Sequence, residues 1–304
     1  MNQLNKWEQE LERLSEKNYE ELNSELFKFY KSALIEIKKQ IKSYIDNYDM
    51  LSFSRRLEAE RLLAVAEAID EILSETTNDV QEAILEFIEK EAKNGYYGVW
   101  YALEGAASLQ LNFPILDNEY INELVFKQID GMTFSERLYE RRDELAKKVT
   151  DELQMAYLRG DGYQKVAKRV NEHTEATYKQ ALRIARTEGG RAQSSAKQRG
   201  YEQAKKIGVK LEKQWLSTLD KKTRHDHREL DGQTVPINGY FKINGYKAKG
   251  PRLFGVAKED INCRCTTIAI VNGITPELRK DNETKEFIKY KNYEQWAKSK
   301  GVEV

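Results

Sequence analysis

The sequence contains 304 residues, 40% of them hydrophobic, and its 50 basic and 50 acidic residues cancel to a formal net charge of zero. The hydrophobic residues are numerous enough to form a sizeable core. No stretch approaches the roughly 18–20 consecutive apolar residues that would span a bilayer, so we expect no membrane contact. A charged N-terminus without an apolar core argues against a secretory signal, and two cysteines exclude a disulfide framework, so we expect the chain to be made in a reducing cytoplasm.

Residues 4–47 have the pattern of one long amphipathic helix. Apolar residues recur there at steps of three and four, a spacing that gathers them on one face of a helix. This apolar stripe consists of Leu4, Trp7, Leu11, Leu14, Leu22, Leu26, Tyr30, Leu34, Ile37, Ile41 and Ile45.

Two more helices are predicted in the first third of the chain. Ser52 is placed to cap a helix over residues 53–74. Thr77 or Asn78 is placed to cap the next helix, which ends near Lys93.

An aromatic run, Gly95–Tyr101, follows these helices. Its two glycines indicate flexibility, and its aromatic rings fit either a packed corner or a binding platform. Pro114 and several turn-forming neighbours then predict a linker over residues 113–130.

A second helical block begins after this linker. We predict helices over residues 135–160, 163–171 and 175–207, the first of which ends at a glycine-containing turn. Gly189 and Gly190 lie near the middle of the last helix. Because two glycines cost a helix roughly 2 kcal/mol relative to alanine, they indicate a kink or a close backbone contact.

The pattern changes from Val209 onward. Apolar residues at short spacing predict strands over residues 213–219 and 265–271. Between them lie three dipeptides typical of tight turns: Asp231-Gly232, Asn238-Gly239 and Asn244-Gly245. The last thirty residues predict at most one short helix, around residues 287–298.

These elements predict a mostly α protein with long amphipathic N-terminal helices and a small C-terminal α+β module. We expect four parts: a helical arm and body over residues 1–112, a linker over 113–130, the module over 131–272, and a tail over 273–304.

The module contains an ordered set of residues by which a family can be recognised. The set comprises Arg186 and Glu188, then Trp215, Asp220, Arg224 and His227, then Asp231 and Gly232, and finally Asn262, Cys263 and Cys265. In this order and at these separations, the set resembles the phage Mu F-like domain of phage minor head (head morphogenesis) proteins. The resemblance covers roughly residues 130–271.

This resemblance implies a minor capsid protein of a tailed bacteriophage that acts in head assembly and is no enzyme. The implied partner is the portal protein, with scaffold or major capsid protein as further partners, and the implied location is the capsid interior after assembly in the bacterial host cytoplasm. We expect the N-terminal arm to dock on the portal or on inner capsid surfaces through its apolar stripe.

One group of residues in the module has the chemistry of a metal site. In a strand, residues two apart point to the same face, so His225 with His227 and Cys263 with Cys265 could each present two ligands. Two sulfurs and two nitrogens form a common closed zinc set, which would be structural. The family pattern matches His227 and both cysteines but not His225, so Asp231 or Asp226 remains an alternative fourth ligand. The alternative without a metal is two small buried cysteines and a histidine bound to the backbone.

The charge is unevenly distributed along the chain. Residues 1–100 contain 13 basic and 21 acidic residues, so the remainder of the chain is basic by eight. The stretch Ala181–Lys213 is the most basic, and it fits either a solvated helix face or non-specific contact with double-stranded DNA. The candidate DNA contacts are Arg191, Lys197, Arg199, Lys205 and Lys206.

Two alternatives to the assembly function therefore stay open. The first is a DNA-binding accessory protein that is packaged in the head and ejected with the genome. The second is a metal-dependent nuclease built on the histidines and the acids Asp220, Asp226 and Asp231. Some members of the resembling family carry toxin or ADP-ribosyltransferase domains after the module, but we expect none here, because the 33 residues after Val271 are too few for one. We expect Arg186 and Glu188 to form a structural ion pair.

Overall fold

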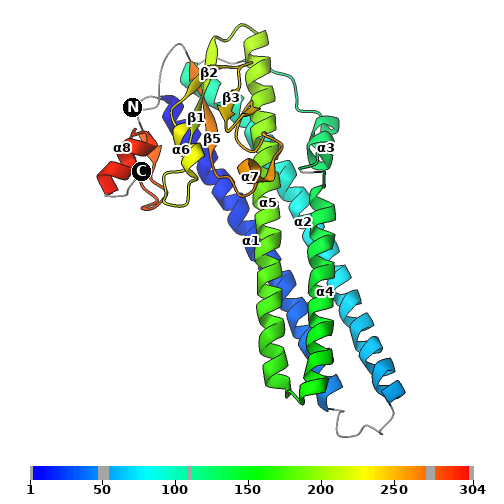
Figure 1. Ribbon diagram of the computed structural model, residues 1–304. Helices are drawn as coiled ribbons and strands as arrows, with labels where there is room; N and C mark the ends of the chain where they lie inside the picture. Colours follow the sequence, from blue (N-terminus) through cyan, green and yellow to red (C-terminus); the bar gives the residue numbers. More distant parts are fainter. Residues whose placement is uncertain (1–2, 47–54, 108–110, 130, 272–277, 301–304) are drawn as a thin grey trace. The chain divides into compact units, whose positions relative to one another are not determined.

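The computed structural model describes residues 3–46, 55–107, 111–129, 131–271 and 278–300 (Figure 1). The chain is 68% helical, which confirms the predicted mostly α class. It divides into two compact units: unit 1 comprises residues 1–19, 87–131 and 186–304, and unit 2 comprises residues 20–86 and 132–185. Among the described helices, none is both long enough and apolar enough to cross a membrane.

Four long helices account for most of the structure: α1 (Gln3–Asp46), α2 (Arg55–Ala107), α4 (Phe134–Arg159) and α5 (Tyr163–Lys206). Helix α1 confirms the helix predicted over residues 4–47. Helix α4 begins with a capping box, in which Thr133 and Glu136 satisfy each other's backbone amides. It ends at Gly160, whose φ of 68° is the left-handed conformation that glycine adopts most easily.

Helix α2 continues through the point where a cap was predicted, so that prediction is wrong. Thr76 and Thr77 donate their hydroxyls to the carbonyls of Ile72 and Leu73, at 2.8 and 2.7 Å. A threonine that bonds back to the carbonyl four residues earlier is a residue of a helix interior and not a cap. The other predicted cap, Ser52, lies outside the described residues.

The two helices predicted over residues 163–171 and 175–207 are likewise one helix, α5. Thr174 lies between them, and its hydroxyl donates to the carbonyl of Val170 at 2.8 Å. The side chain is buried, so its hydrogen bond is made within the helix and the chain does not turn there.

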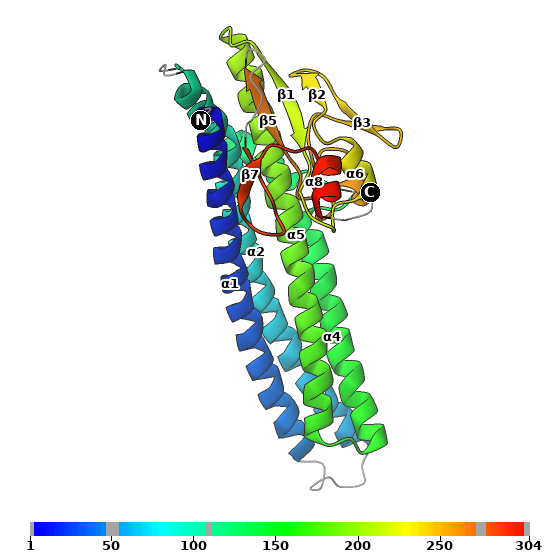
Figure 2. The ribbon, with the colours of Figure 1, turned by 90° about the vertical axis from the view of Figure 1, so that its left-hand side faces the viewer.

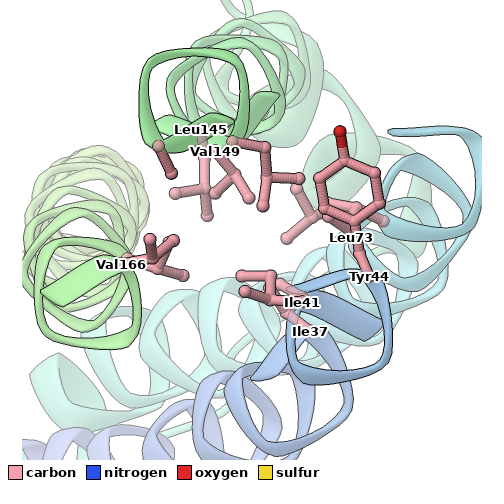
Figure 3. Packing of buried hydrophobic residues seen from close by; sticks show 11 residues of the cluster. Ile37, Ile41, Tyr44, Leu73, Leu145, Val149 and Val166 are labelled. Atoms are coloured by element: carbon pink, nitrogen blue, oxygen red, sulfur yellow. The ribbon is translucent and has the colours of Figure 1, made fainter. Parts of the chain in front are cut away.

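Unit 2 is a bundle of four helical segments around one apolar core (Figure 3). Each helix contributes to the core: Ile37, Ile41 and Tyr44 from α1, Ile69 and Leu73 from α2, Leu145, Val149, Leu153 and Ala156 from α4, and Val166 and Val170 from α5. Of the apolar stripe of α1, Ile37 and Ile41 are buried in this core, and Leu34 and Ile45 pack against it. These residues are not available for docking on other head proteins, whereas Leu14 is 45% exposed, and docking through the rest of the stripe stays a prediction.

Unit 1 contains the ends of α1, α2 and α5 together with the small sheets (Figure 2). Strand β1 (Leu211–Leu216) is central to a three-stranded antiparallel sheet, between β2 (Thr234–Pro236) and β5 (Thr266–Val271). Strands β1 and β5 correspond to the two strands that the sequence predicts. The buried end of α5 covers this sheet, since Lys197 donates to the carbonyl of Thr267 at 2.9 Å.

Short elements complete unit 1. A hairpin joins β3 (Phe241–Ile243) and β4 (Tyr246–Ala248) through the predicted Asn244-Gly245 turn, and a second pairs β6 (Leu278–Lys280) with β7 (Phe287–Lys289). The short helices are α3 (Asn118–Phe126), α6 (His225–Glu229), α7 (Ala257–Asp260) and α8 (Tyr293–Lys300). Helix α3 occupies the predicted linker, and the tail holds β6 and β7 as well as a helix. The proposed four-part division of the chain stays a prediction.

Glycines let the helices of unit 1 approach one another closely. A methyl group at Gly189 would lie 2.3 Å from the ring of Phe87, and one at Gly190 would lie 2.3 Å from the guanidinium of Arg252. The glycine pair in α5 thus marks a close contact, as predicted. The run that begins at Gly95 is part of α2, and its residues Tyr96 and Trp100 are buried.

Candidate metal centre

His227 is presented to the module interior by the short helix α6. The side chain is 2% exposed, and its ring packs edge-on against Trp215 with centroids 5.7 Å apart. His225 lies two residues earlier on the same helix, and its side chain is 67% exposed, with Nδ1 3.5 Å from a carboxylate oxygen of Glu229. Residues two apart on a helix point in nearly opposite directions. The prediction of His225 as a ligand is therefore wrong, because the His-x-His segment is helical and not extended.

Cys263 and Cys265 come from the segment between α7 and β5, where residues two apart do share a face. Both sulfurs lie 3.5 Å from Nδ1 of His227. A zinc ion with bonds of about 2.3 Å to sulfur and 2.0 Å to nitrogen, at tetrahedral angles, would place nitrogen and sulfur roughly 3.5 Å apart. The three donor atoms lie within 4.8 Å of one another, and all three residues are buried. The two nitrogen–sulfur spacings are those of a zinc tetrahedron.

The proposed alternatives for the fourth ligand do not join these three residues. Asp231 pairs with Arg279 at 2.6 Å and accepts the amides of Ser217 and Tyr293, each at 2.7 Å. Asp226 accepts a hydrogen bond from Asn244 at 2.5 Å. Within the described part of the chain, the group of histidine, cysteine and acidic donors contains His227, Cys263 and Cys265 alone.

The electrostatics of the site favour a charged sulfur. Hydrogen bonding with Cys265 and with His227, and the nearby Arg252 guanidinium, hold the pKa of Cys263 well below its ordinary value in spite of burial. Burial raises the pKa of Cys265 well above its ordinary value. Burial lowers the pKa of His227, but the Cys263 sulfur outweighs this and raises it overall. A thiolate beside an imidazolium is the arrangement that a metal ion exchanges for protons when it binds.

Further family residues hold the cysteine segment in place. Arg224 donates to the carbonyl of Ile261 at 2.5 Å, and Arg186 donates to the side chain of Asn262 at 3.2 Å. Arg264, between the cysteines, pairs with Asp220. These bonds fix the backbone from which both sulfurs project.

Gly232 and Arg252 provide two other supports. Gly232 has a φ of 79° and donates its amide to the carbonyl of Trp215 at 2.9 Å, which closes the turn after α6. Arg252 donates to the carbonyl of Cys263 at 2.7 Å and to that of Gly190 at 2.8 Å. Sequence reasoning missed Arg252, because nothing in the pattern marks an arginine eleven residues before a cysteine.

The predicted pair of Arg186 with Glu188 is replaced by a different one. Arg186 lies over the ring of Tyr19, 4.3 Å from its centroid. Glu188 pairs with Arg191 at 2.5 Å, and both side chains are at most 2% exposed. Along α5, Arg186 and Glu188 are two residues apart and so face different directions.

Three of the five candidate DNA contacts form ion pairs within unit 1, which corrects part of the predicted DNA contact. Arg191 is buried against Glu188, and Lys197 is buried and lies 3.6 Å from a carboxylate oxygen of Glu8. Arg199 pairs with Asp117 at 3.1 Å but is 36% exposed. Lys205 and Lys206, at the end of α5, are exposed. Arg191 and Lys197 therefore cannot contact phosphates from these positions.

A comparison with known families supports the resemblance inferred from the sequence. Residues 147–268 match the family model described as phage Mu protein F like protein, and they contain the whole candidate metal centre. The resemblance of this module to the phage Mu F-like family is therefore confirmed.

Two relatives extend the match over nearly the whole chain. Minor head protein GP7 of Bacillus phage SPP1 is 29% identical over 301 residues, which cover 96% of this chain and 97% of GP7. A protein of Enterococcus faecalis named NAD(+)–arginine ADP-ribosyltransferase EFV is 50% identical over 296 residues, 97% of this chain. This chain spans only 61% of that longer relative. No solved structure matches the chain.

Proposed function

We propose that this protein is a minor component of a tailed-phage head that acts in head assembly and binds the portal inside the capsid. The observation that carries this proposal is the end-to-end match with minor head protein GP7, which leaves almost nothing of either chain unaligned. Because part of the α1 stripe is buried within unit 2, the contact with other head components would use the exposed surfaces of the chain.

The test is quantitative mass spectrometry of purified particles together with co-purification with the portal protein. We expect the chain at a low, reproducible ratio to portal in mature particles, and retention on immobilised portal. Presence in particles without portal retention would refute the portal contact alone. Absence from mature particles and from empty heads alike would refute the head function.

We further propose that the chain itself is not an enzyme. The transferase name belongs to a relative of which a large part lies outside the match, whereas a minor head protein is matched over almost its full length. Incubation with labelled NAD⁺ and an arginine-containing acceptor should give no label transfer. Transfer above the level of a heat-inactivated sample would overturn this proposal.

We propose that His227, Cys263 and Cys265 bind a structural zinc ion. Support comes from the two 3.5 Å nitrogen–sulfur distances and from the burial of all three donors, which leaves no access for a substrate. We expect about one zinc per chain by elemental analysis, with a melting temperature that falls on chelation.

The matched variants are C263S and H225N. C263S removes a donor and should lose the zinc, whereas H225N alters an exposed histidine two residues from His227 and should retain it. Equal zinc content in wild type and C263S would refute the site.

Contact with double-stranded DNA is a second proposed function, and it is favoured by Lys205 and Lys206, which are exposed at the end of α5. Such contact would be non-specific. The logarithm of the binding constant should fall with the logarithm of the salt concentration, with a slope of about 0.9 for each phosphate that the protein neutralises. DNA retention at low salt that K205Q/K206Q weakens would support it. Retention that these substitutions leave unchanged would refute it.

A further inference from the structure

A further side chain, in addition to the three ligands, contacts the candidate metal centre. Glu259 of α7 has no exposed surface at all, and one carboxylate oxygen lies 3.2 Å from Nε2 of His227. A buried carboxylate is costly unless it is well bonded. Glu259 lies on the side of the imidazole opposite the two sulfurs, which lie beside Nδ1.

The two sets of contacts involve different ring nitrogens: Glu259 contacts Nε2, and the two cysteine sulfurs lie beside Nδ1. A neutral imidazole has one N–H and one free lone pair, so the nitrogen that donates a hydrogen bond cannot bind a metal. A carboxylate accepts hydrogen bonds and donates none when ionised. When a metal replaces the Nδ1 proton, Glu259 therefore keeps the remaining proton on Nε2, and the lone pair of Nδ1 is directed to the side of Cys263 and Cys265.

We infer that Glu259 is a positioning residue that selects Nδ1 of His227 as the metal-binding nitrogen and fixes the orientation of the ring. This inference rests on the proposed zinc site and adds to it the nitrogen that binds and the residue that selects it. Carboxylates that accept the second N–H of a metal-bound histidine raise its basicity as a ligand.

Glu259 is itself anchored from the β3–β4 hairpin. Its second carboxylate oxygen accepts a hydrogen bond from the side-chain amide of Asn244 at 3.2 Å. Asn244 has a φ of 49° in the hairpin turn, a conformation that asparagine tolerates better than most residues. The turn that the Asn244-Gly245 dipeptide predicts thus also places an amide at the outer side of the metal centre.

Charge also favours this arrangement. The carboxylate of Glu259 adds one negative charge in a buried place. The ammonium group of Lys258 lies 3.7 Å from a carboxylate oxygen of Glu259, and the buried guanidinium of Arg252 donates to the Cys263 carbonyl. These two cations offset the negative charge that the carboxylate brings to the site.

The experiment compares zinc affinity and histidine tautomer in wild type, E259Q and the control E212Q. Glu212 is an exposed carboxylate on β1 of the same sheet module. We expect E259Q to weaken zinc binding about 10–100-fold in a chelator competition and E212Q to leave it unchanged. N244G, which keeps a backbone suited to positive φ but removes the amide, should weaken binding by less than E259Q.

Nitrogen NMR gives a readout that a merely structural role would not change. The chain has three histidines, so the ring nitrogens of His227 can be assigned by comparison with H225N and H173N. We expect zinc-loaded wild type to carry its proton on Nε2 and the metal on Nδ1. If E259Q does not fold, N244G and the wild-type spectrum still test the inference.

The outcomes separate the two proposals. If the wild-type protein binds no zinc, the proposed metal site itself is refuted. Wild type with zinc, but with the metal on Nε2 or with an affinity that both E259Q and N244G leave unchanged, would overturn the role of Glu259 and leave the zinc site standing.

Discussion

Replacing Gly95 with alanine tests a close backbone contact between two helices of unit 1. An added methyl group at Gly95 of α2 would lie 2.3 Å from the backbone carbonyl oxygen of Gln193 on α5. Ordinary contact begins near 3.5 Å, so the helices would have to separate by about 1 Å. Backbone on both sides leaves no flexible side chain to yield. We therefore take the upper part of the usual overpacking cost, about 3 kcal/mol.

The intrinsic effect of the substitution has the opposite sign. Alanine is better than glycine in a helix interior by about 1 kcal/mol. The net expectation for G95A is a loss of about 2 kcal/mol in the free energy of unfolding. If the two helices were not in contact, the same substitution would stabilise the protein by about 1 kcal/mol. The sign of the change in unfolding free energy thus shows whether the two helices are in contact at Gly95.

Tryptophan fluorescence in a urea titration is the suitable assay. All four tryptophans, Trp7, Trp100, Trp215 and Trp296, belong to unit 1, so their emission reports the unfolding of that unit. The control is G98A, whose methyl group would lie 2.9 Å from the flexible end of Leu11, and whose effect should be near zero. Stabilisation by G95A to the same extent as at an exposed helical site would refute the reasoning.

Three further predictions concern buried charges in unit 1. Burial and the neighbouring Lys249 lower the pKa of Lys213 to about 8, so between pH 8 and 10 the unfolded chain binds more protons than the folded one. Stability should therefore rise with pH over that range in wild type, by at most about 3 kcal/mol, and not in K213M. R191M removes the guanidinium that neutralises buried Glu188 and should cost about 3–5 kcal/mol by urea titration; a loss below 1 kcal/mol would contradict the buried pair. D231N should leave the zinc content unchanged but speed proteolysis of residues 278–300, because Asp231 anchors Arg279; loss of zinc with intact β6–α8 would reverse this assignment.

Sequence patterns were most informative where one physical signal acts over many residues. The three- and four-residue spacing predicted α1 to within one residue at each end, and short-period apolar runs located β1 and β5. Local polar residues were less informative. Thr77 is a residue type common at helix caps, but its hydroxyl bonds backward inside α2. Its sequence neighbours do not reveal which of these two roles it has.

The candidate metal centre could be predicted in part for the same reason. Spacing correctly paired Cys263 with Cys265, because their segment is extended, but it also paired His225 with His227, whose segment is a single helical turn. Glu259 could not be found from spacing, since it reaches the imidazole of His227 only through the tertiary fold. The basic stretch predicted DNA contact because a linear sequence does not reveal that Glu188 lies against Arg191 within the core.

The positions of the two units' segments along the chain have a consequence for folding during synthesis on the ribosome. Unit 2 draws on residues 20–86 and 132–185, so all its parts have been made once residue 185 has been translated. Unit 1 combines the first 19 residues with residues 186–304, so the earliest segment of the chain must wait for the last. Because domains generally fold as units and N-terminal parts first, the bundle should form cotranslationally while the metal-binding module folds late. A ribosome-stalled chain ending near residue 220 should therefore already protect the bundle from protease and leave residues 3–19 open to it.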